Sequence, residues 1–342
     1  MADKTGIQWT DMTWNPVRGC RRVSPGCENC YAETTAGRFS GPGMPYEGLV
    51  RLSPKGARWT GEIMQVRDHL TDPLRKTKPR YIFVNSMSDL FFESLPNEYI
   101  AAVFGVMAAA THHKFQVLTK RPQRMLEFFE WVEKTRNPNR FRHPELIEHA
   151  ACQTTGADAG RLFAAANECA GRNAWPLPNV HLGVSVENQE TADLRVPLLL
   201  QAPAAIRWVS YEPAIGPVDF WGPRYANPNG GQTGALTSWE GGLDWIVVGG
   251  ESGPGARPFH LDWARDVIAS GKASGVPIFV KQLGKKPYQN VPFPEGTEYV
   301  GEKVVGGVTV PGLCFPGRDG KKGGNMDLWP EELRVREWPE AA

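Results

Sequence analysis

The sequence has no long hydrophobic run and almost no net charge. No segment approaches the ~18 uninterrupted apolar residues of a membrane-spanning helix, and residues 1–16 hold no apolar stretch of signal-peptide length. We therefore expect a cytoplasmic protein without membrane contact. The 38 Lys and Arg residues oppose 37 acidic residues, which leaves a formal charge of +1. The near-zero net charge gives no indication of a nucleic-acid partner, although local basic patches remain compatible with one.

Cysteine is also sparse, with six in 342 residues. Cytoplasmic thiols normally stay reduced, so clustering among them indicates metal binding or chemistry rather than disulfides. Three of the six do cluster. Cys20, Cys27 and Cys30 lie in GCRRVSPGCENCYAE with the spacing C-x6-C-x2-C.

Three thiolates on one tight loop can ligate three irons of a [4Fe–4S] cluster and leave the fourth iron open for chemistry. A structural zinc site is the alternative, but it needs a fourth ligand, usually within a second C-x2-C or an H-x3–5-H pair. Neither motif follows. The other candidate ligands are isolated in the sequence: His69, Cys152, Cys169 and Cys314. An iron–sulfur cluster is the first prediction, and zinc is the second.

Short apolar runs rich in β-branched and aromatic residues predict buried parallel strands. Helical patterns over 98–110, 123–134 and 258–270 lie between several of them, which favours an α/β fold. We expect a barrel domain over residues 1–287, with a helical insertion at about 135–178 and a long loop at about 221–243. Residues 288–342 are expected to form a C-terminal appendage. The predicted strands are 81–85, 115–119, 180–186, 206–210, 245–249 and 277–281.

Polar, charged or glycine residues follow every predicted strand. In a parallel barrel these strand ends converge on one face, where barrel enzymes place their sites. Exposed loops are polar in any protein, which is the alternative explanation. The candidate site residues taken from these ends are Ser86, Ser88, Asp89, Lys120, Arg121, Ser185, Glu187, Glu212, Gly249, Gly250, Glu251, Lys281 and Gln282.

The opening of the chain resembles the signature of a phage-associated family of uncharacterised, radical-SAM-like proteins. The matching segment is IQWTDMTWNPVRGCRRVSPGCENCYAE. Similar blocks extend the resemblance over most of the chain: VNSMSDLF, LTKRP, GVSVEN, SYEP and VVGGESGPGARP. Through this family the chain resembles the radical SAM superfamily, including the spore photoproduct lyase branch.

The resemblance implies a partial (β/α)6 TIM-type barrel with the cluster loop after a first strand at about residues 13–17. It implies that S-adenosylmethionine chelates the open iron and is cleaved by one electron to a 5′-deoxyadenosyl radical, which abstracts a substrate hydrogen. The electron would come from a donor such as flavodoxin or ferredoxin, in the host cytoplasm if the protein is phage-encoded. Two features depart from the usual C-x3-C-x2-C pattern. The first gap has six residues, and Asn29 stands where an aromatic residue usually precedes the last cysteine.

Individual roles follow from position. Asp89 is the charge available for the cofactor's ammonium, or else it caps the next helix, a role that Ser88 could share. Glu187 and Glu212 could bind ribose hydroxyls or form ion pairs with Lys120 or Arg121.

Other expected roles are less specific. Gly249 and Gly250 allow close backbone approach or a plain tight turn. Trp14 and Tyr31 flank the cysteines and could stack on a base, whereas Trp208 and Trp245 are expected in the core. Lys281 and Gln282 could meet a phosphate or carboxylate.

The leading hypothesis is a radical-SAM-type enzyme that acts on a nucleotide or nucleic acid. The alternative is a non-catalytic phage protein, stabilised by zinc or an iron–sulfur cluster, that binds nucleic acid or protein. Radical chemistry on a peptide or small metabolite is a third option. Basic runs at 75–80, 120–124 and 281–286 add local positive charge, for which solvated surface is the ordinary explanation.

Overall fold

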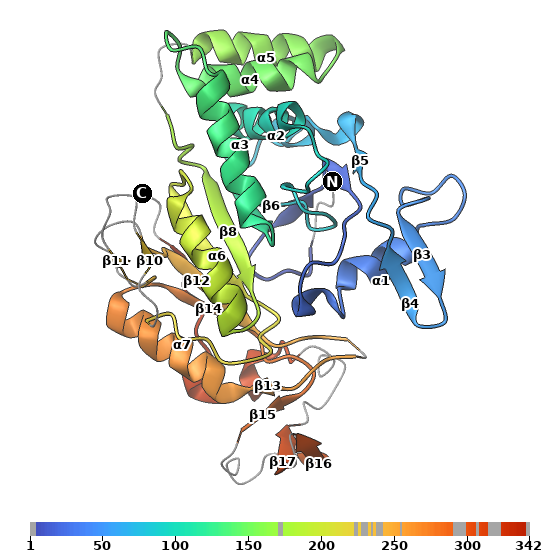
Figure 1. Ribbon diagram of the computed structural model, residues 1–342, viewed down its shortest axis with the longest axis vertical. Helices are drawn as coiled ribbons and strands as arrows, with labels where there is room; N and C mark the ends of the chain where they lie inside the picture. Colours follow the sequence, from blue (N-terminus) through green and yellow to red (C-terminus); the bar gives the residue numbers. More distant parts are fainter. Residues whose placement is uncertain are drawn as a thin grey trace.

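A curled sheet of seven parallel strands organises the molecule. The computed structural model describes residues 5–169, 174–221, 225–226, 232–233, 235–236, 242–253, 255–289, 299–305, 308–313 and 323–339. All neighbouring strands of the sheet are parallel and follow sequence order, so the predicted α/β class and six strands are confirmed. The strands are β1 (Met12–Trp14), β6 (Tyr81–Val84), β7 (Lys114–Thr119), β8 (Val180–Val186), β9 (Ile206–Tyr211), β12 (Trp245–Gly249) and β14 (Ile278–Gln282). The sheet curls into a half-barrel compatible with a TIM-like barrel (Figure 1).

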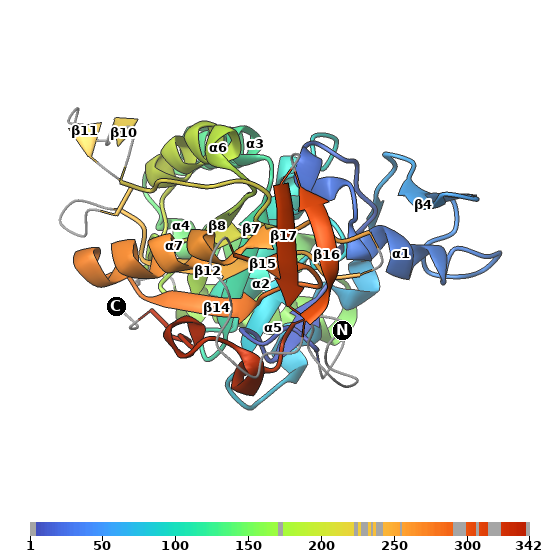
Figure 2. The same cartoon turned by 90° about the horizontal axis from the view of Figure 1, so that it is seen from below.

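Helices lie against the outside of this sheet (Figures 1 and 2). They are α2 (Asn97–Ala109), α3 (Pro122–Thr135), α6 (Gln189–Gln201) and α7 (Leu261–Ser274). The expected insertion is helical, with α4 (Arg142–Cys152) and α5 (Gly156–Glu168) stacked beyond α2. None of the helices in the described ranges is long and apolar enough to cross a membrane.

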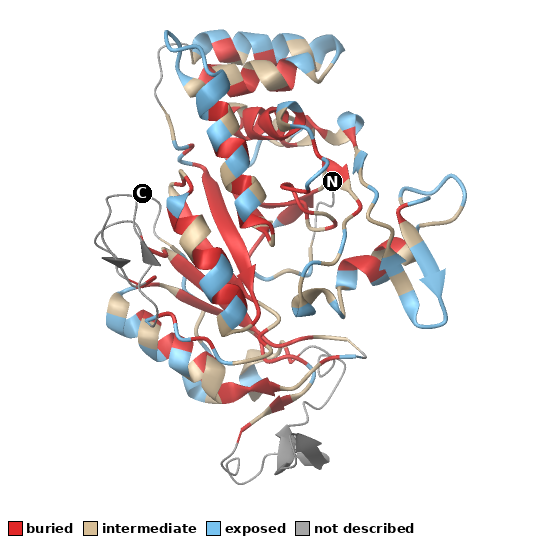
Figure 3. Ribbon diagram, viewed as in Figure 1, coloured by how far each residue is buried: buried red, intermediate tan, exposed pale blue. Residues whose placement is uncertain are grey.

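Alternation along the strands separates an outer core from the barrel interior. On β6, Ile82 and Val84 pack in the outer core with the helices, whereas Phe83 packs inward. Burial is nearly continuous along the central strands, as expected for a sheet covered on both faces (Figure 3). The predicted core role of Trp208 and Trp245 is confirmed, because both are 0% exposed. The inward cluster consists of Trp9, Phe83, Trp208, Trp245, Val247 and Phe279.

The carboxyl ends of the seven strands form one edge, which we call the mouth. The chain between β1 and β6 lies there and contains β2 (Val17–Arg18), η1 (Pro25–Cys27) and α1 (Tyr31–Gly37). A hairpin of β3 (Val50–Ser53) and β4 (Gly56–Trp59) follows and projects from the body (Figure 1). The return to β6 passes through β5 (Met64–Gln65), η2 (Arg67–His69) and η3 (Asp72–Arg75).

The C-terminal region is joined to the barrel rather than set apart from it. A small sheet of β13 (Phe259–His260), β15 (Pro287–Tyr288), β17 (Val308–Leu313) and β16 (Tyr299–Val305) crosses the expected boundary at residue 287. After η5 (Met326–Leu328) and η6 (Glu331–Leu333), the chain bonds along β14: the Val280 amide donates to Val335 and the Glu337 amide to Ile278. Within the loop expected at 221–243, β10 (Tyr225–Ala226) pairs with β11 (Gln232–Thr233), and most other residues of that loop lie outside the described ranges.

Candidate functional site

The three clustered cysteines lie on one loop at the mouth. This cysteine loop, residues 19–30, links β2 to α1. Its first residue, Gly19, forms a bridge with Ser88 just beyond β6. Cys20, Cys27 and Cys30 are all free and half-buried. They are thus accessible to a ligand and lie beside the strand ends, as the sequence predicted.

The thiols are electrostatically coupled to one another. Burial raises the pKa of Cys20 to about 12, although Arg121 lowers it. Burial also raises the pKa of Cys30, and the nearby Cys27 raises it further. Thiolates at these positions therefore need added positive charge, and a bound metal would supply it while releasing protons.

Arg121 is a cation that lies beside Cys20. Its side chain is buried behind the loop, with Nη1 3.8 Å from Cys20 Sγ. Its Nη2 donates to the Arg21 carbonyl at 3.0 Å, and its Nε donates to Glu93 at 3.0 Å. The guanidinium also lies 4.7 Å from the centre of the Phe92 ring. Arg121 therefore holds the first part of the cysteine loop.

Asp89 supports Arg121 and has no free lone-pair direction toward a ligand. Its Oδ1 accepts from the Phe91 amide at 3.0 Å and from Thr119 Oγ1 at 2.8 Å. Its Oδ2 accepts from the Lys120 amide and from Arg121 Nη1, both at 3.0 Å. The side chain fixes the turn after β6 to the end of β7. An incoming ammonium would have to displace one of these donors.

Glu187, at the end of β8, holds the middle of the cysteine loop. The carboxylate is fully buried, accepts from Ser24 Oγ at 2.8 Å, and pairs with Lys120 and with Arg195. Burial would raise the pKa of Glu187, but Lys120 and Arg195 bring it below its ordinary value. A Cβ on Gly26 would lie 2.4 Å from Glu187 Cγ, so this contact requires glycine.

The last part of the loop is held by Glu251, beyond β12. Asn29 Nδ2 donates to Glu251 Oε2 at 3.0 Å and to the Gly255 carbonyl at 2.8 Å. Arg257 pairs with the same carboxylate at 2.7 Å and donates to the Pro25 carbonyl at 2.9 Å. Thus Asp89 through Arg121, Glu187 and Glu251 each fix a different part of the cysteine loop.

A second ion pair lies at the ends of β9 and β14. Lys281 Nζ lies 2.8 and 2.9 Å from the two oxygens of Glu212, and Gln282 Nε2 donates to the same carboxylate at 3.1 Å. Both charged side chains keep some exposure, 17% for Lys281 and 14% for Glu212. Ser185 links this pair to β8, because its hydroxyl accepts from Lys120 Nζ at 2.6 Å and donates to the Glu212 carbonyl.

The glycines of the mouth lie against this pair. Gly249 ends β12, and a Cβ there would lie 3.3 Å from Glu212 Oε1. The Gly250 amide donates to the Gln282 carbonyl at 3.0 Å. Both glycines therefore sit in close backbone packing between β12 and β14.

The turn after β6 is bonded to the chain around the cysteine loop. Ser86 Oγ exchanges hydrogen bonds with the Asn15 side chain, and Ser88 Oγ donates to the Val17 carbonyl at 2.8 Å. Tyr31 donates to the Ser86 carbonyl at 2.7 Å, and the residue stays 55% exposed. It is therefore available to a substrate.

Trp14 corrects an expectation. It is 0% exposed, and its Nε1 donates to the His69 carbonyl at 2.8 Å. The side chain belongs to the core because β1 alternates and turns it toward the helices. It has no face left for base stacking.

Sequence reasoning missed the residues that hold the loop from both sides. Asn15 and Asn29 lie in the N-terminal segment that resembles the family signature, but as uncharged residues they were not considered as candidates. Arg195 lies in the middle of α6, and Arg257 follows the glycine turn. Nothing in their local sequence distinguishes these arginines from surface residues.

Cys20, Cys27 and Cys30 are the thiols that the cysteine loop offers to a metal. Three thiolates bound to a single zinc, each at ~2.3 Å, would lie within about 4 Å of one another. In the described ranges, no three His, Cys, Asp or Glu side chains form a group that could hold a metal ion. Cys152 and Cys169 lie away on α4 and after α5, and Cys314 lies outside the described residues.

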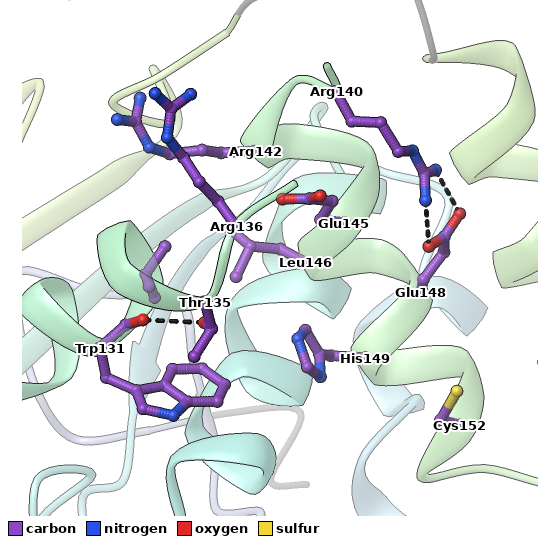
Figure 4. Close-up of a pocket in the computed structure, with 11 residues that line it drawn as sticks. Trp131, Thr135, Arg136, Arg140, Arg142, Glu145, Leu146, Glu148, His149 and Cys152 are labelled. Carbon is purple, nitrogen blue, oxygen red and sulfur yellow. Dashed lines mark hydrogen bonds and ion pairs between the residues drawn. The ribbon is translucent and has the colours of Figure 1, made fainter. Parts of the chain in front are cut away.

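A separate cavity of about 260 Å³ lies between α3 and α4 (Figure 4). Its floor contains Trp131 and Leu146. The arginines at its rim are already paired, Arg140 with Glu148 and Arg142 with Glu133. The cavity lies between α3 and the helical insertion, apart from the cysteine loop (Figure 1).

Comparison with known protein families gives a match over most of the chain. The model of a family described as a protein of unknown function, DUF5131, matches residues 4–311. The search among curated proteins and the search among solved structures found no match. Because the family model spans most of the chain, the protein belongs to the DUF5131 family.

Proposed function

We propose that this protein is a radical-SAM-type enzyme whose Cys20, Cys27 and Cys30 hold a [4Fe–4S] cluster. One observation carries the proposal: three free, half-buried thiols share a loop that is fixed at the carboxyl edge of a curled parallel sheet. That edge is where barrel enzymes place their chemistry. When bound, the cluster supplies the electron that cleaves S-adenosylmethionine to methionine and a 5′-deoxyadenosyl radical.

The chain's own residues would bind and orient the cofactor. Lys281 and Glu212 form the partly exposed ion pair of the mouth, and such a pair can exchange its partners for the carboxylate and ammonium of an amino acid. Glu212 can alternatively accept from ribose hydroxyls. Asp89, Glu187 and Glu251 are committed to the loop, so in this proposal they act as positioning residues.

A nucleotide or nucleic acid is the proposed substrate, and a flavodoxin or ferredoxin is the proposed electron donor. The projecting β3–β4 hairpin supports the substrate class. It carries Arg51, Lys55 and Arg58, all exposed, and no acidic residue between 50 and 59. A basic arm beside the cysteine loop suits phosphate binding.

The test is anaerobic reconstitution with iron and sulfide. We expect about four irons per chain with a broad absorption near ~400 nm, and 5′-deoxyadenosine after addition of dithionite and S-adenosylmethionine. Cys152→Ala is the matched control, because this exposed thiol lies on α4. One tightly held zinc and no 5′-deoxyadenosine would instead support a zinc-stabilised binding protein.

A further inference from the structure

The side-chain amide of Asn85 is buried without a hydrogen-bond partner. Asn85 is 3% exposed, and neither its Nδ2 nor its Oδ1 has a hydrogen-bond partner among the residues that the structure describes. Buried amides normally have partners, because leaving both a donor and an acceptor unsatisfied is costly. Such a group needs an explanation.

The backbone of Asn85 is strained as well. Its φ is 60°, and no other non-glycine residue in the described part of the chain has a positive φ. The conformation is held by its neighbours: the Asn85 amide donates to the Trp14 carbonyl at 2.8 Å, and Asn15 Oδ1 accepts from the Met87 amide at 3.0 Å. Strain of this kind collects at ligand sites, where the surrounding structure enforces it.

Asn85 also lies at the mouth. It follows Val84 at the carboxyl end of β6, two residues after Phe83, which packs into the barrel interior. The charged groups there are paired with one another, Lys120 with Glu187 and Lys281 with Glu212. Among the described residues, the Asn85 amide is thus a neutral group at the mouth that lacks hydrogen-bond partners. It presents one donor and one acceptor side by side.

We propose that Asn85 binds the donor–acceptor edge of a nucleobase, with adenine as the best match. An asparagine amide can donate to adenine N7 and accept from its N6 amino group. This inference deepens the proposed function, on which the identity of the base rests. The base is either the adenine of S-adenosylmethionine or the base of a nucleotide substrate.

The test measures adenosine binding by titration calorimetry, without cluster or reductant, so its result does not depend on S-adenosylmethionine cleavage. Asn85→Gly removes the amide and tolerates a positive φ. We expect it to weaken adenosine binding about 5- to 150-fold, the range for one bidentate base contact. Its melting temperature should equal or exceed that of the wild type, because the strain and the unsatisfied amide are both removed.

Gln116→Met is the matched control. Gln116 is 0% exposed, its Oε1 also lacks a partner, and its Nε2 donates to the Trp9 carbonyl in the inward core. This variant should leave adenosine affinity unchanged. Equal loss of S-adenosylmethionine and adenosine affinity in Asn85→Gly would assign the base to the cofactor, and loss for adenosine alone would assign it to the substrate. Unchanged or undetectable adenosine binding, or loss for L-methionine alone, would overturn the proposal.

Discussion

Arg121 reaches from the end of β7 to the first cysteine of the loop, with its Nη1 3.8 Å from Cys20 Sγ. The same nitrogen donates to Asp89 at 3.0 Å. A side chain that the sequence placed among the candidate site residues therefore lies behind the thiol. Its charge favours the thiolate form of Cys20.

The first prediction concerns the ligands. Replacing Cys20, Cys27 or Cys30 singly with Ala should abolish iron loading, because each thiolate is expected to bind a different iron. Iron and sulfide analysis after anaerobic reconstitution measures this. Cys169→Ala should load as the wild type does. Loss of iron in Cys314→Ala would mean that a fourth protein ligand closes the site.

The second prediction concerns Asp89→Ala. This change leaves the buried Arg121 without its buried carboxylate partner, since Asp89 and Arg121 are only 7% and 5% exposed, whereas its other partner, Glu93, is 49% exposed. Removing one member of a buried pair typically costs about 3–5 kcal/mol. We expect a loss of unfolding free energy of that order by urea denaturation, together with poorer cluster loading. Glu130→Ala, at an exposed ion pair with Lys134 in α3, should cost far less.

If Asp89 instead serves mainly as the ammonium partner, the result differs. Stability and iron loading would then be unchanged in Asp89→Ala, while S-adenosylmethionine affinity would fall by orders of magnitude. Anaerobic titration calorimetry on the loaded variant distinguishes the two roles.

The third prediction concerns Gly26→Ala. The added methyl would lie 2.4 Å from Glu187, whose carboxylate is held by Lys120 and Arg195. Overpacking of this kind costs about 1–3 kcal/mol, and the loop should shift and load less iron. Gly160→Ala in α5 is the control, because no atom lies within 4 Å of the new Cβ. That variant should be as stable as the wild type or more so.

The fourth prediction concerns pH. Burial lowers the pKa of His181 from 6.5 to about 4. Below about pH 6.5, His181 is therefore protonated in the unfolded chain but stays neutral in the folded protein. The free energy of unfolding consequently decreases as the pH falls from about 6.5 toward 4. At pH 5 this one group should cost about 2 kcal/mol relative to pH 8. Urea unfolding of His181→Phe should show a correspondingly flatter pH dependence over this window, and an unchanged slope would contradict the assignment.

The sheet could be predicted from the sequence because each of the six predicted strands corresponds to a short run of mainly apolar, β-branched and aromatic residues. Runs such as 180–186 are mostly apolar, and every residue of β8 is buried. The placement of the cysteine loop after a first strand was what the family resemblance implied, because β1 is only three residues long and was not among the predicted runs. These features need no knowledge of distant contacts.

The roles of the acidic residues could not be predicted in the same way. Ser24 and Glu187 are 163 residues apart, and Asn29 and Glu251 are 222 apart. Whether a carboxylate meets a ligand or its own chain depends on such contacts, which leave no local pattern. The unsatisfied amide of Asn85 is likewise visible only once its surroundings are packed.

The aromatic residues of the inward cluster have a consequence for the proposed reaction. Trp9 packs against Trp208 and Trp245, which also contact each other, and Trp338 of the tail stacks on Trp245 and contacts Tyr81. These aromatic side chains fill the amino end of the barrel in the part of the chain that the structure describes. If the proposed reaction takes place at the mouth, reactant and product would enter and leave by that same end, so a slowly released product would inhibit the next round competitively.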